Sequence, residues 1–318
     1  MVTPGVRIVT PEEITARIGV AALLPVMREA LRAEAEGRVE VPLRAGWTFD
    51  GGEFGMLAMP ARSKDLNFAA FKFLTLVDGN RALGIPGVMG ELALLDAVTG
   101  APQARLPAEE VTLLRTAACS AIATDLLALR DADTLALFGS GPQAAHHAEA
   151  MLAVRPVKQI LVQGRNRVRA EKLAEELRVK FGVCAIAGPN AVALRDATIL
   201  CTVTNARAPL FRDDEIHPHA HINAIGAYRP DMCELPPDLL RAATIFADSK
   251  TPVAREAGDL LSAFGSPERV MAQIRAIGEI LAQPLPQRPE GRTVYKAVGN
   301  AGQNLYAAAA ILKLLDDA

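Results

Sequence analysis

Apolar runs of strand length recur along the middle of the chain, and segments with a helical pattern separate them. They fall at residues 134–138, 157–163, 183–186, 197–203, 221–225 and 244–247. Strands that alternate with helices are typical of parallel sheets, because a helical crossover must carry the chain back to the edge where the next strand starts. The pattern predicts an α/β domain built on a doubly wound parallel sheet.

The two ends of the chain follow a different pattern. A threonine, a proline and two glutamates at residues 10–13 are typical of a capped helix start, and a second helix is expected at about 23–36. Short apolar runs then predict strands at 39–43, 54–60, 69–76 and 88–96. These elements indicate an α+β domain whose sheet is antiparallel or mixed.

Two further helices set the expected domain boundaries. A long helix is predicted over residues 108–130, and a last helix at about 302–315 returns from the α/β domain to the first one. The first domain is therefore expected to comprise residues 1–120 and 295–318. Residues 121–294 are expected to form the α/β domain.

The first strand of the central domain ends in a glycine-rich turn. Residues 134–138 run into Gly139-Ser-Gly141-Pro142-Gln143-Ala144, and a helical pattern follows. In G-x-G-x-x-A, the first glycine allows the tight turn, the second lets backbone amides approach a pyrophosphate, and the alanine keeps helix and strand close. The helix N-terminus adds positive potential for the phosphates. The turn predicts a Rossmann-type dinucleotide site, and the alternative is an ordinary strand–helix turn.

The end of the second strand indicates which dinucleotide binds. An NAD site usually places Asp or Glu there, to accept hydrogen bonds from the adenosine ribose. Here the residues are Arg165, Asn166 and Arg167, and the next carboxylate is Glu171. Guanidinium groups match the charge and the planar geometry of a 2′-phosphate. NADPH is therefore expected as the preferred cofactor while use of NADH stays open, and the alternative is a solvated basic turn.

Composition excludes several classes of function. The net charge is −2 at pH 7, so the chain lacks a basic field for nucleic acid or for an anionic membrane surface. No apolar run is long enough to cross a bilayer, and residues 1–7 carry no signal-peptide pattern. The four cysteines are scattered without a C-x-x-C pair, as in reduced cytosolic proteins. We expect a cytoplasmic protein that binds neither nucleic acid nor membranes.

The histidines do not form a recognisable metal site. His217, His219 and His221 alternate along the chain, but no acidic residue or cysteine stands at ligand spacing. His146 and His147 follow the glycine-rich turn, and we interpret them as surface histidines of the helix start. No metal is expected.

Three cations in the first domain stand inside apolar sequence. Arg44 is expected at the end of a strand, Lys72 within a strand whose neighbours Phe71 and Phe73 face the other way, and Arg115 on the long helix. A charge in an apolar setting is costly unless it is paired. A substrate carboxylate is one candidate partner, and internal carboxylates such as those of residues 91 and 110 are the alternative.

Several segments, taken in order, resemble the ornithine cyclodeaminase/mu-crystallin family. They are residues 72–86, 94–102, 114–118, 139–144, 224–235 and 294–299. The resemblance implies enzymes of amino or imino acids, with a substrate and dimerisation domain built from both chain ends and a Rossmann domain between them. It maps the family's substrate-binding arginine, lysine and second arginine onto Arg44, Lys72 and Arg115. It also places Thr204 near the nicotinamide and implies a homodimer.

Departures from the family pattern indicate whether the chain resembles the cyclodeaminase or the reductase branch of the family. Ornithine cyclodeaminases carry an aspartate after the glycine and alanine that correspond to residues 226 and 227, and it handles the second amino group of the diamine. Tyr228 stands at that position, so cyclodeamination is disfavoured. The turn that Tyr228 opens resembles the reductase branch, and we count this residue with the cofactor site. Glu234 is assigned to the following turn and helix, and Asn304 stands where the family often carries Asp.

The resulting hypothesis is an NAD(P)H-dependent ketimine reductase. It would convert 1-pyrroline-2-carboxylate to L-proline and also 1-piperideine-2-carboxylate to L-pipecolate. Arg44 and Arg115 would hold the carboxylate, and Lys72 would bind it or relay a proton to the imine nitrogen. The alternatives are an alanine-type dehydrogenase that uses free ammonia, an ornithine cyclodeaminase, and a non-catalytic NADPH-dependent binding protein like mu-crystallin.

Overall fold

The computed structural model describes residues 5–189, 191–283 and 287–317. Residues 1–4, part of the stretch examined for a signal peptide, lie outside this set. The chain divides into two compact units, Met1–Thr116 with Asn300–Ala318, and Ala117–Gly299. The helix α3 (Ala108–Leu127) runs through the first boundary. No described helix has the length and apolar character that a membrane span requires.

The first unit is built on a seven-stranded mixed sheet with the order β1-β7-β6-β5-β4-β2, and β3 pairs with β4 outside this path. The strands β4, β5, β6 and β7 follow one another in the chain and pair antiparallel, each with the next. The edge strand β1 pairs in parallel with β7. The strands are β1 (Arg7–Ile8), β2 (Val39–Glu40), β3 (Ala45–Phe49), β4 (Phe54–Ser63), β5 (Phe68–Leu76), β6 (Val88–Asp96) and β7 (Pro102–Pro107). The short 3-10 helices are η1 (Asp50–Gly52) and η2 (Asp78–Leu83).

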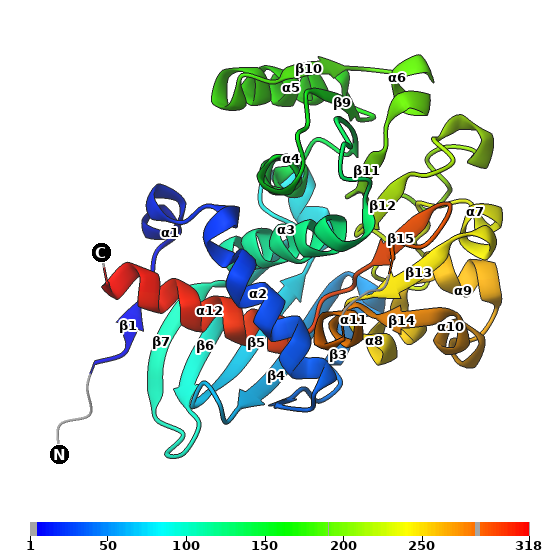
Figure 1. The fold of residues 1–318 in the computed structure, drawn as a ribbon. Helices are drawn as coiled ribbons and strands as arrows, with labels where there is room; N and C mark the ends of the chain where they lie inside the picture. The colour runs from blue at the N-terminus through cyan, green and yellow to red at the C-terminus, as the bar shows by residue number, and fades with distance from the viewer. Residues whose placement is uncertain (1–4, 190, 284–286, 318) are drawn as a thin grey trace. The chain divides into compact units, whose positions relative to one another are not determined.

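Helices from both ends of the chain cover one face of this sheet. The helix α12 (Ala301–Asp316) packs on β4, β5 and β6, and it lies side by side with α2 (Val20–Ala35), as Figure 1 shows. The predicted return of the last helix to the first domain is therefore confirmed. The helix α1 (Pro11–Arg17) starts with the predicted cap, in which Thr10 and Glu13 form a reciprocal capping box.

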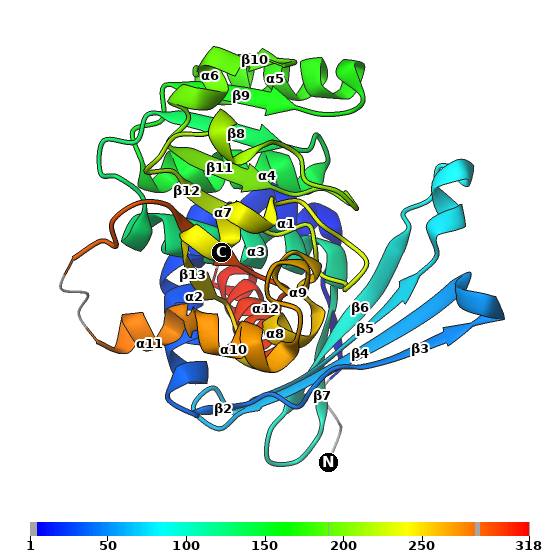
Figure 2. The same cartoon turned by 90° about the vertical axis from the view of Figure 1, so that its right-hand side faces the viewer.

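The second unit contains an eight-stranded parallel sheet with the order β10-β9-β8-β11-β12-β15-β13-β14. The succession from β10 through β9, β8 and β11 to β12 can be followed in Figure 2. From β10 to β12, this is the order of the first five strands of a Rossmann fold, and the direction of winding reverses between β8 and β11. Beyond β12 the order departs from that fold, because β15 lies between β12 and β13. The strands are β8 (Thr134–Phe138), β9 (Gln159–Gln163), β10 (Cys184–Ala187), β11 (Ile199–Thr202), β12 (His221–Ala224), β13 (Thr244–Ala247), β14 (Ile274–Ala276) and β15 (Thr293–Lys296).

Helices connect and cover these parallel strands. Two of them, α4 and α5, pack along β8 and β9, and α5 also packs on β10. The helices are α4 (Pro142–Val154), α5 (Arg167–Phe181), α6 (Ala191–Asp196), α7 (Pro237–Ala242), α8 (Lys250–Glu256), α9 (Gly258–Phe264), α10 (Pro267–Gln273) and α11 (Ile277–Ala282), with the 3-10 helix η3 (Asp213–Glu215).

Two details of the sequence prediction are wrong. The strand expected over 39–43 ends at Glu40, because Pro42 has no backbone N–H to offer a sheet. Arg44 therefore lies in the link before β3 and does not end a strand. The short strands β14 and β15 were not predicted, although β15 lies between β12 and β13 in the middle of the sheet.

Candidate functional site

The pleat of the first sheet separates Lys72 from its aromatic neighbours, as predicted. In the register of the sheet, Lys72 pairs with Met59 on β4 and with Leu92 on β6. All three side chains are buried on the face that the helices cover, and Lys72 is 2% exposed. Phe71 and Phe73 point to the opposite face and are 41% and 39% exposed. The sheet thus holds a lysine amine inside an apolar layer.

The amine of Lys72 has a polar partner but no charged one. Lys72 Nζ donates a hydrogen bond to Thr112 Oγ1 on α3, and that hydroxyl donates to the carbonyl of Ala108 at 2.6 Å. No carboxylate of the described residues lies within ion-pair distance of Lys72, which removes the internal-partner alternative for this residue. Burial lowers the pKa of Lys72 well below its usual value, and the positive charges of Arg115 and Arg44 lower it further.

Arg115 lies one turn of α3 after Thr112, and it is also buried. Its Nη1 donates a hydrogen bond of 3.1 Å to Gln303 Oε1 on α12. The positive charges of both Arg115 and Arg44 act on the buried amine of Lys72. The first unit therefore carries a concentrated positive charge that suits a small carboxylate.

Asn304 follows Gln303 on α12 and is 1% exposed. Neither its Oδ1 nor its Nδ2 has a hydrogen-bond partner among the described residues. An unsatisfied buried amide is costly, and its NH2 group and carbonyl oxygen offer hydrogen-bond donors and an acceptor to a polar ligand. From the sequence, Asn304 was noted only as a departure from the family pattern.

In the second unit, the glycine-rich turn has the geometry that a pyrophosphate needs. Gly139 has a φ of 125°, and a Cβ there would lie 2.9 Å from Val203 Cγ2, so only glycine fits. Gly141 caps α4 without any side-chain cap, and a Cβ there would meet nothing within 4 Å. Ala144 is fully buried between helix and sheet. The exposed N-terminus of α4 is therefore open to an anion.

Further residues of this edge fit a dinucleotide. Pro142 occupies the first turn of α4, where its missing N–H costs nothing. The Oε1 atom of Gln143 is buried and has no partner among the described residues, which suits a ligand hydroxyl. The turn after β9 adjoins the glycine-rich turn, since a Cβ on Gly164 would lie 3.2 Å from Ser140 Oγ.

The two predicted phosphate-binding arginines differ in their surroundings. Arg165 is exposed and forms no ion pair with any described residue, whereas Arg167 pairs with Glu171 at 2.7 Å. Asn166 caps α5 by accepting a hydrogen bond of 3.0 Å from the backbone N–H of Arg169. Arg165 is therefore the guanidinium that is available to a 2′-phosphate without breaking an existing pair.

Thr204 follows β11, and its side chain is occupied by the protein itself. Its Oγ1 donates to Glu234 Oε1 at 2.7 Å and accepts from the backbone N–H of Ala206 at 3.1 Å. Tyr228 is half-buried against the core of the second unit, and its N–H donates to the carbonyl of Gly226 at 3.2 Å. Both residues lie just beyond the carboxyl ends of β11 and β12.

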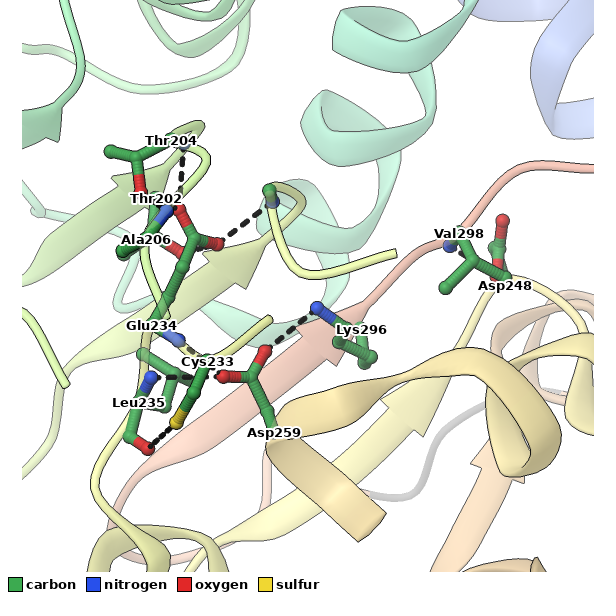
Figure 3. A network of polar contacts seen from close by, with 11 residues as sticks. Thr202, Thr204, Ala206, Cys233, Glu234, Leu235, Asp248, Asp259, Lys296 and Val298 are labelled. Atoms are coloured by element: carbon green, nitrogen blue, oxygen red, sulfur yellow. Dashed lines mark hydrogen bonds and ion pairs between the residues drawn. The ribbon is translucent and has the colours of Figure 1, made fainter. Parts of the chain in front are cut away.

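The sequence did not reveal a buried ionic network at the same edge (Figure 3). Glu234 lies in the turn before α7, as expected, but it is buried and accepts hydrogen bonds from the ends of β11 and β12, which the sequence did not predict. Asp259 on α9 and Lys296 on β15, both fully buried, form an ion pair of 2.9 Å. A lysine inside the apolar strand 293–296 was the available signal, because a buried amine needs a nearby anion.

His147 is not a surface residue. Its ring is fully buried, with Nε2 3.0 Å from Ser120 Oγ and Nδ1 2.8 Å from the carbonyl of Gln143. The prediction of a surface histidine is therefore wrong, because α4 turns this position toward α3. No group of three potential metal ligands occurs within the part of the chain that the structure describes.

Comparisons with known proteins agree on one family. The sequence model of the ornithine cyclodeaminase/mu-crystallin family matches residues 6–317. A Delta(1)-pyrroline-2-carboxylate reductase of Bacillus cereus is 34% identical over 277 residues, which cover 86% of this chain and 85% of that relative. The ketimine reductase mu-crystallin of Mus musculus is 34% identical over 250 residues, covering 79% and 77%.

A solved structure extends the similarity to the whole fold. The Delta(1)-pyrroline-2-carboxylate reductase of Thermococcus litoralis, in complex with NADH and L-proline, matches with a TM-score of 0.91. The two sequences are 29% identical, and the match covers 98% of each chain.

Proposed function

Because the chain belongs to the ornithine cyclodeaminase/mu-crystallin family, we propose that it reduces 1-pyrroline-2-carboxylate to L-proline with a nicotinamide cofactor. The same chemistry extends to the six-membered ring, 1-piperideine-2-carboxylate, which gives L-pipecolate. The observation that carries the proposal is the buried lysine of the first unit, which hydrogen-bonds to Thr112 and has no carboxylate of the described residues within ion-pair distance. The positive charges of Arg115 and Arg44 also act on it.

The first unit would bind the substrate through its carboxylate. Arg115 and Arg44 would hold that group, since a guanidinium donates two parallel hydrogen bonds to a carboxylate. Gln303 keeps the Arg115 fork in place through its Oε1. The unpartnered amide of Asn304 offers a further donor and acceptor on α12. An open-chain diamine would need a carboxylate for its second ammonium, and Tyr228 cannot provide one.

Lys72 would supply the proton. Reduction of a C=N bond requires a hydride at carbon and a proton at nitrogen, and the cofactor supplies the hydride. The pKa of Lys72 is lowered toward neutral pH. A general acid is most effective when its pKa lies near the pH at which the enzyme works. Thr112 orients the amine by accepting its hydrogen bond. Lysine deprotonation would thus accompany protonation of the substrate nitrogen.

The second unit would bind the cofactor, with NADPH preferred over NADH. The residues that would hold it are Gly139, Gly141, Pro142, Gln143, Ala144, Arg165, Asn166, Arg167, Thr204 and Tyr228. The N-terminus of α4 would bind the pyrophosphate, and the exposed Arg165 would pair with the 2′-phosphate. Arg167 would have to leave Glu171 to do the same, so its contribution is expected to be smaller.

The open face of the first sheet supports a homodimer. Trp47, Met56, Thr75 and Met89 form one row across β3, β4, β5 and β6. Trp47 is 51% exposed, and Met56 and Met89 are also exposed. A large exposed apolar patch is typical of an interface in a water-soluble fold. A second copy of the chain is the expected occupant, because the row of side chains is uncharged and the family resemblance implies a homodimer.

The function is tested by following NADPH oxidation with 1-pyrroline-2-carboxylate in the absence of ammonium. The proposal expects oxidation without ammonium and a higher kcat/KM for NADPH than for NADH. Oxidation that occurs only with pyruvate and ammonium would identify an alanine-type dehydrogenase. Saturable binding of small acids without any oxidation would identify a binding protein.

A further inference from the structure

The carboxylate of Glu234 joins the ends of two neighbouring strands in the second unit. Oε1 accepts from the backbone N–H and the hydroxyl of Thr204, both at 2.7 Å. Oε2 accepts from Thr202 Oγ1 and from the backbone N–H of Gly226, both at 2.8 Å. The carboxylate thus uses its full set of acceptor sites on the segments that follow β11 and β12 (Figure 3).

These two segments touch each other where Glu234 binds them. A Cβ on Gly226 would lie 2.1 Å from the carbonyl oxygen of Thr204 and 2.4 Å from Glu234 Oε1, so no side chain fits there. Two of the four donors to Glu234 are backbone N–H groups, and they cannot reverse their direction as a hydroxyl can. The spacing between the two segments therefore depends on an acceptor at both carboxylate oxygens.

A second charged pair fixes Glu234 itself. Asp259 Oδ1 accepts hydrogen bonds from the backbone N–H groups of Glu234 and Leu235, and its Oδ2 pairs with Lys296. Gly258, the preceding residue, packs against the turn at 229–232, and a Cβ there would lie 2.0 Å from the carbonyl oxygen of Met232. The position of Glu234 is therefore fixed both by the hydrogen bond of its backbone N–H to Asp259 and by the four donors to its carboxylate.

The position of the Glu234 hydrogen bonds in the sheet indicates which half of the cofactor lies near them. In a doubly wound sheet the dinucleotide lies across the carboxyl ends of the strands, with one half on each side of the point where the winding reverses. The glycine-rich turn follows β8, and β9 carries the arginines on the same side. The segments that Glu234 joins follow β11 and β12 on the other side, which is the side of the nicotinamide half.

We propose that Glu234 is a positioning residue for the nicotinamide half of the cofactor: it holds the segments after β11 and β12 at the spacing that this half requires. The proposal rests on the proposed nicotinamide-dependent function. Thr204 then contributes through its backbone, because its hydroxyl is committed to Glu234 and to Ala206. The adenine half, bound at β8 and β9, does not depend on Glu234.

The test compares E234Q with the control T202V. In E234Q the amide nitrogen must face the N–H of either Thr204 or Gly226, whichever way the side chain turns. T202V removes one hydroxyl donor and leaves both backbone donors with their acceptors. Each variant is titrated with two pairs of probes, NADPH with adenosine 2′,5′-bisphosphate and NADH with adenosine 5′-diphosphate, and binding is followed by calorimetry.

We expect E234Q to weaken binding of the dinucleotide by about tenfold or more, the effect of one unsatisfied buried donor, and to leave binding of the adenine fragment within about twofold. T202V is expected to change binding of the dinucleotide and of the adenine fragment by no more than about threefold. Equal weakening of dinucleotide and fragment, or no change in either, would overturn the proposal. If E234Q does not fold, E234D carries the same test, because its shorter carboxylate cannot reach both segments.

Because these titrations need no substrate, they separate the role of Glu234 from the proposed reaction. A wild-type protein that binds the dinucleotide but reduces no imine would contradict the reaction and leave the Glu234 test intact. Wild-type turnover of the imine, together with unchanged dinucleotide binding in E234Q, would support the reaction and refute the role of Glu234.

Discussion

Lys72 and Arg115 are two buried cations of the same unit: burial lowers the pKa of the lysine, and the positive charge of the arginine lowers it further. Like charges that are buried together reduce stability unless an anion joins them. A carboxylate bound beside Lys72 would therefore offset the cost of burying its amine, which hydrogen-bonds to Thr112. The first two predictions follow from this relationship.

Replacement of Lys72 by methionine should stabilise the protein while it abolishes turnover. The methionine fills a similar volume without a buried amine, and each kcal/mol gained should raise Tm by about 2–4 °C. Turnover should fall by at least about 100-fold, the usual contribution of a general acid. The exposed Lys64 gives the control K64M, which should change neither the Tm nor the turnover. Wild-type turnover in K72M would remove Lys72 from the mechanism.

The stabilising effect of K72M should depend on pH in a defined direction. The pKa of Lys72 is lower in the folded protein than in the unfolded chain, so the unfolded chain binds more protons between the two values. The free energy of unfolding of the wild type therefore rises with pH through this window, toward the ordinary lysine pKa of about 10.4. Thermal denaturation of both proteins from pH 6 upward should show the difference in Tm shrinking, and a growing difference would contradict the buried amine.

Replacement of Gln303 by glutamate should weaken substrate binding specifically. The new carboxylate would lie at hydrogen-bond distance from Arg115 Nη1 and would compete with the carboxylate of the substrate. A charged hydrogen bond of roughly 1.5–3 kcal/mol predicts a rise in KM for the imine of about 10–100-fold. KM for NADPH should stay the same, because Gln303 belongs to the first unit. A parallel rise in both KM values would indicate general disruption instead.

Replacement of Arg165 by alanine should reduce the preference for NADPH more than replacement of Arg167. Arg165 is free of ion pairs with the described residues, whereas Arg167 already pairs with Glu171. The ratio of kcat/KM for NADPH to that for NADH should fall by about tenfold in R165A, the loss of one charged contact. R167A is the matched comparison. A larger effect in R167A would show that the 2′-phosphate displaces Glu171.

A glutamate in place of Trp47 should dissociate the proposed dimer. Trp47 belongs to the apolar row on the open face of the first sheet, and a buried charge at an interface costs several kcal/mol. Sedimentation velocity should give a dimer for the wild type and a monomer for W47E. The exposed Val179, on α5 of the second unit, offers the control V179E, which should remain dimeric. A monomeric wild type would refute the interface.

The sequence predicted the family, the fold class and the enzyme class, an oxidoreductase, and all three are confirmed. The alternation of apolar runs with helical segments, the glycine-rich turn and the ordered family segments carry this information, because they are local features of the sequence. The buried row of Lys72 was predicted for the same reason, since alternation alone separates it from Phe71 and Phe73. The position of Arg44 was predicted wrongly, because Pro42 ends the strand β2 earlier than expected.

The residues that the sequence missed act through contacts between distant segments. Gln303 meets Arg115 from a helix 188 positions further along the chain, and Asp259 meets Lys296 across 37 positions. No local pattern encodes such pairs. Glu234 illustrates the same limit, because its role depends on Thr204 and Gly226, which belong to two other segments. A charged residue in an apolar strand indicates that a partner exists but does not identify it.

The most direct test of the account is the product formed from 1-pyrroline-2-carboxylate and NADPH without ammonium. The purified protein is incubated with both compounds, and proline is quantified on a chiral column beside the NADPH consumed. The account predicts one L-proline for each NADPH oxidised, and loss of this product in K72M. NADPH consumption without L-proline, or no consumption at all, would contradict the proposed reaction.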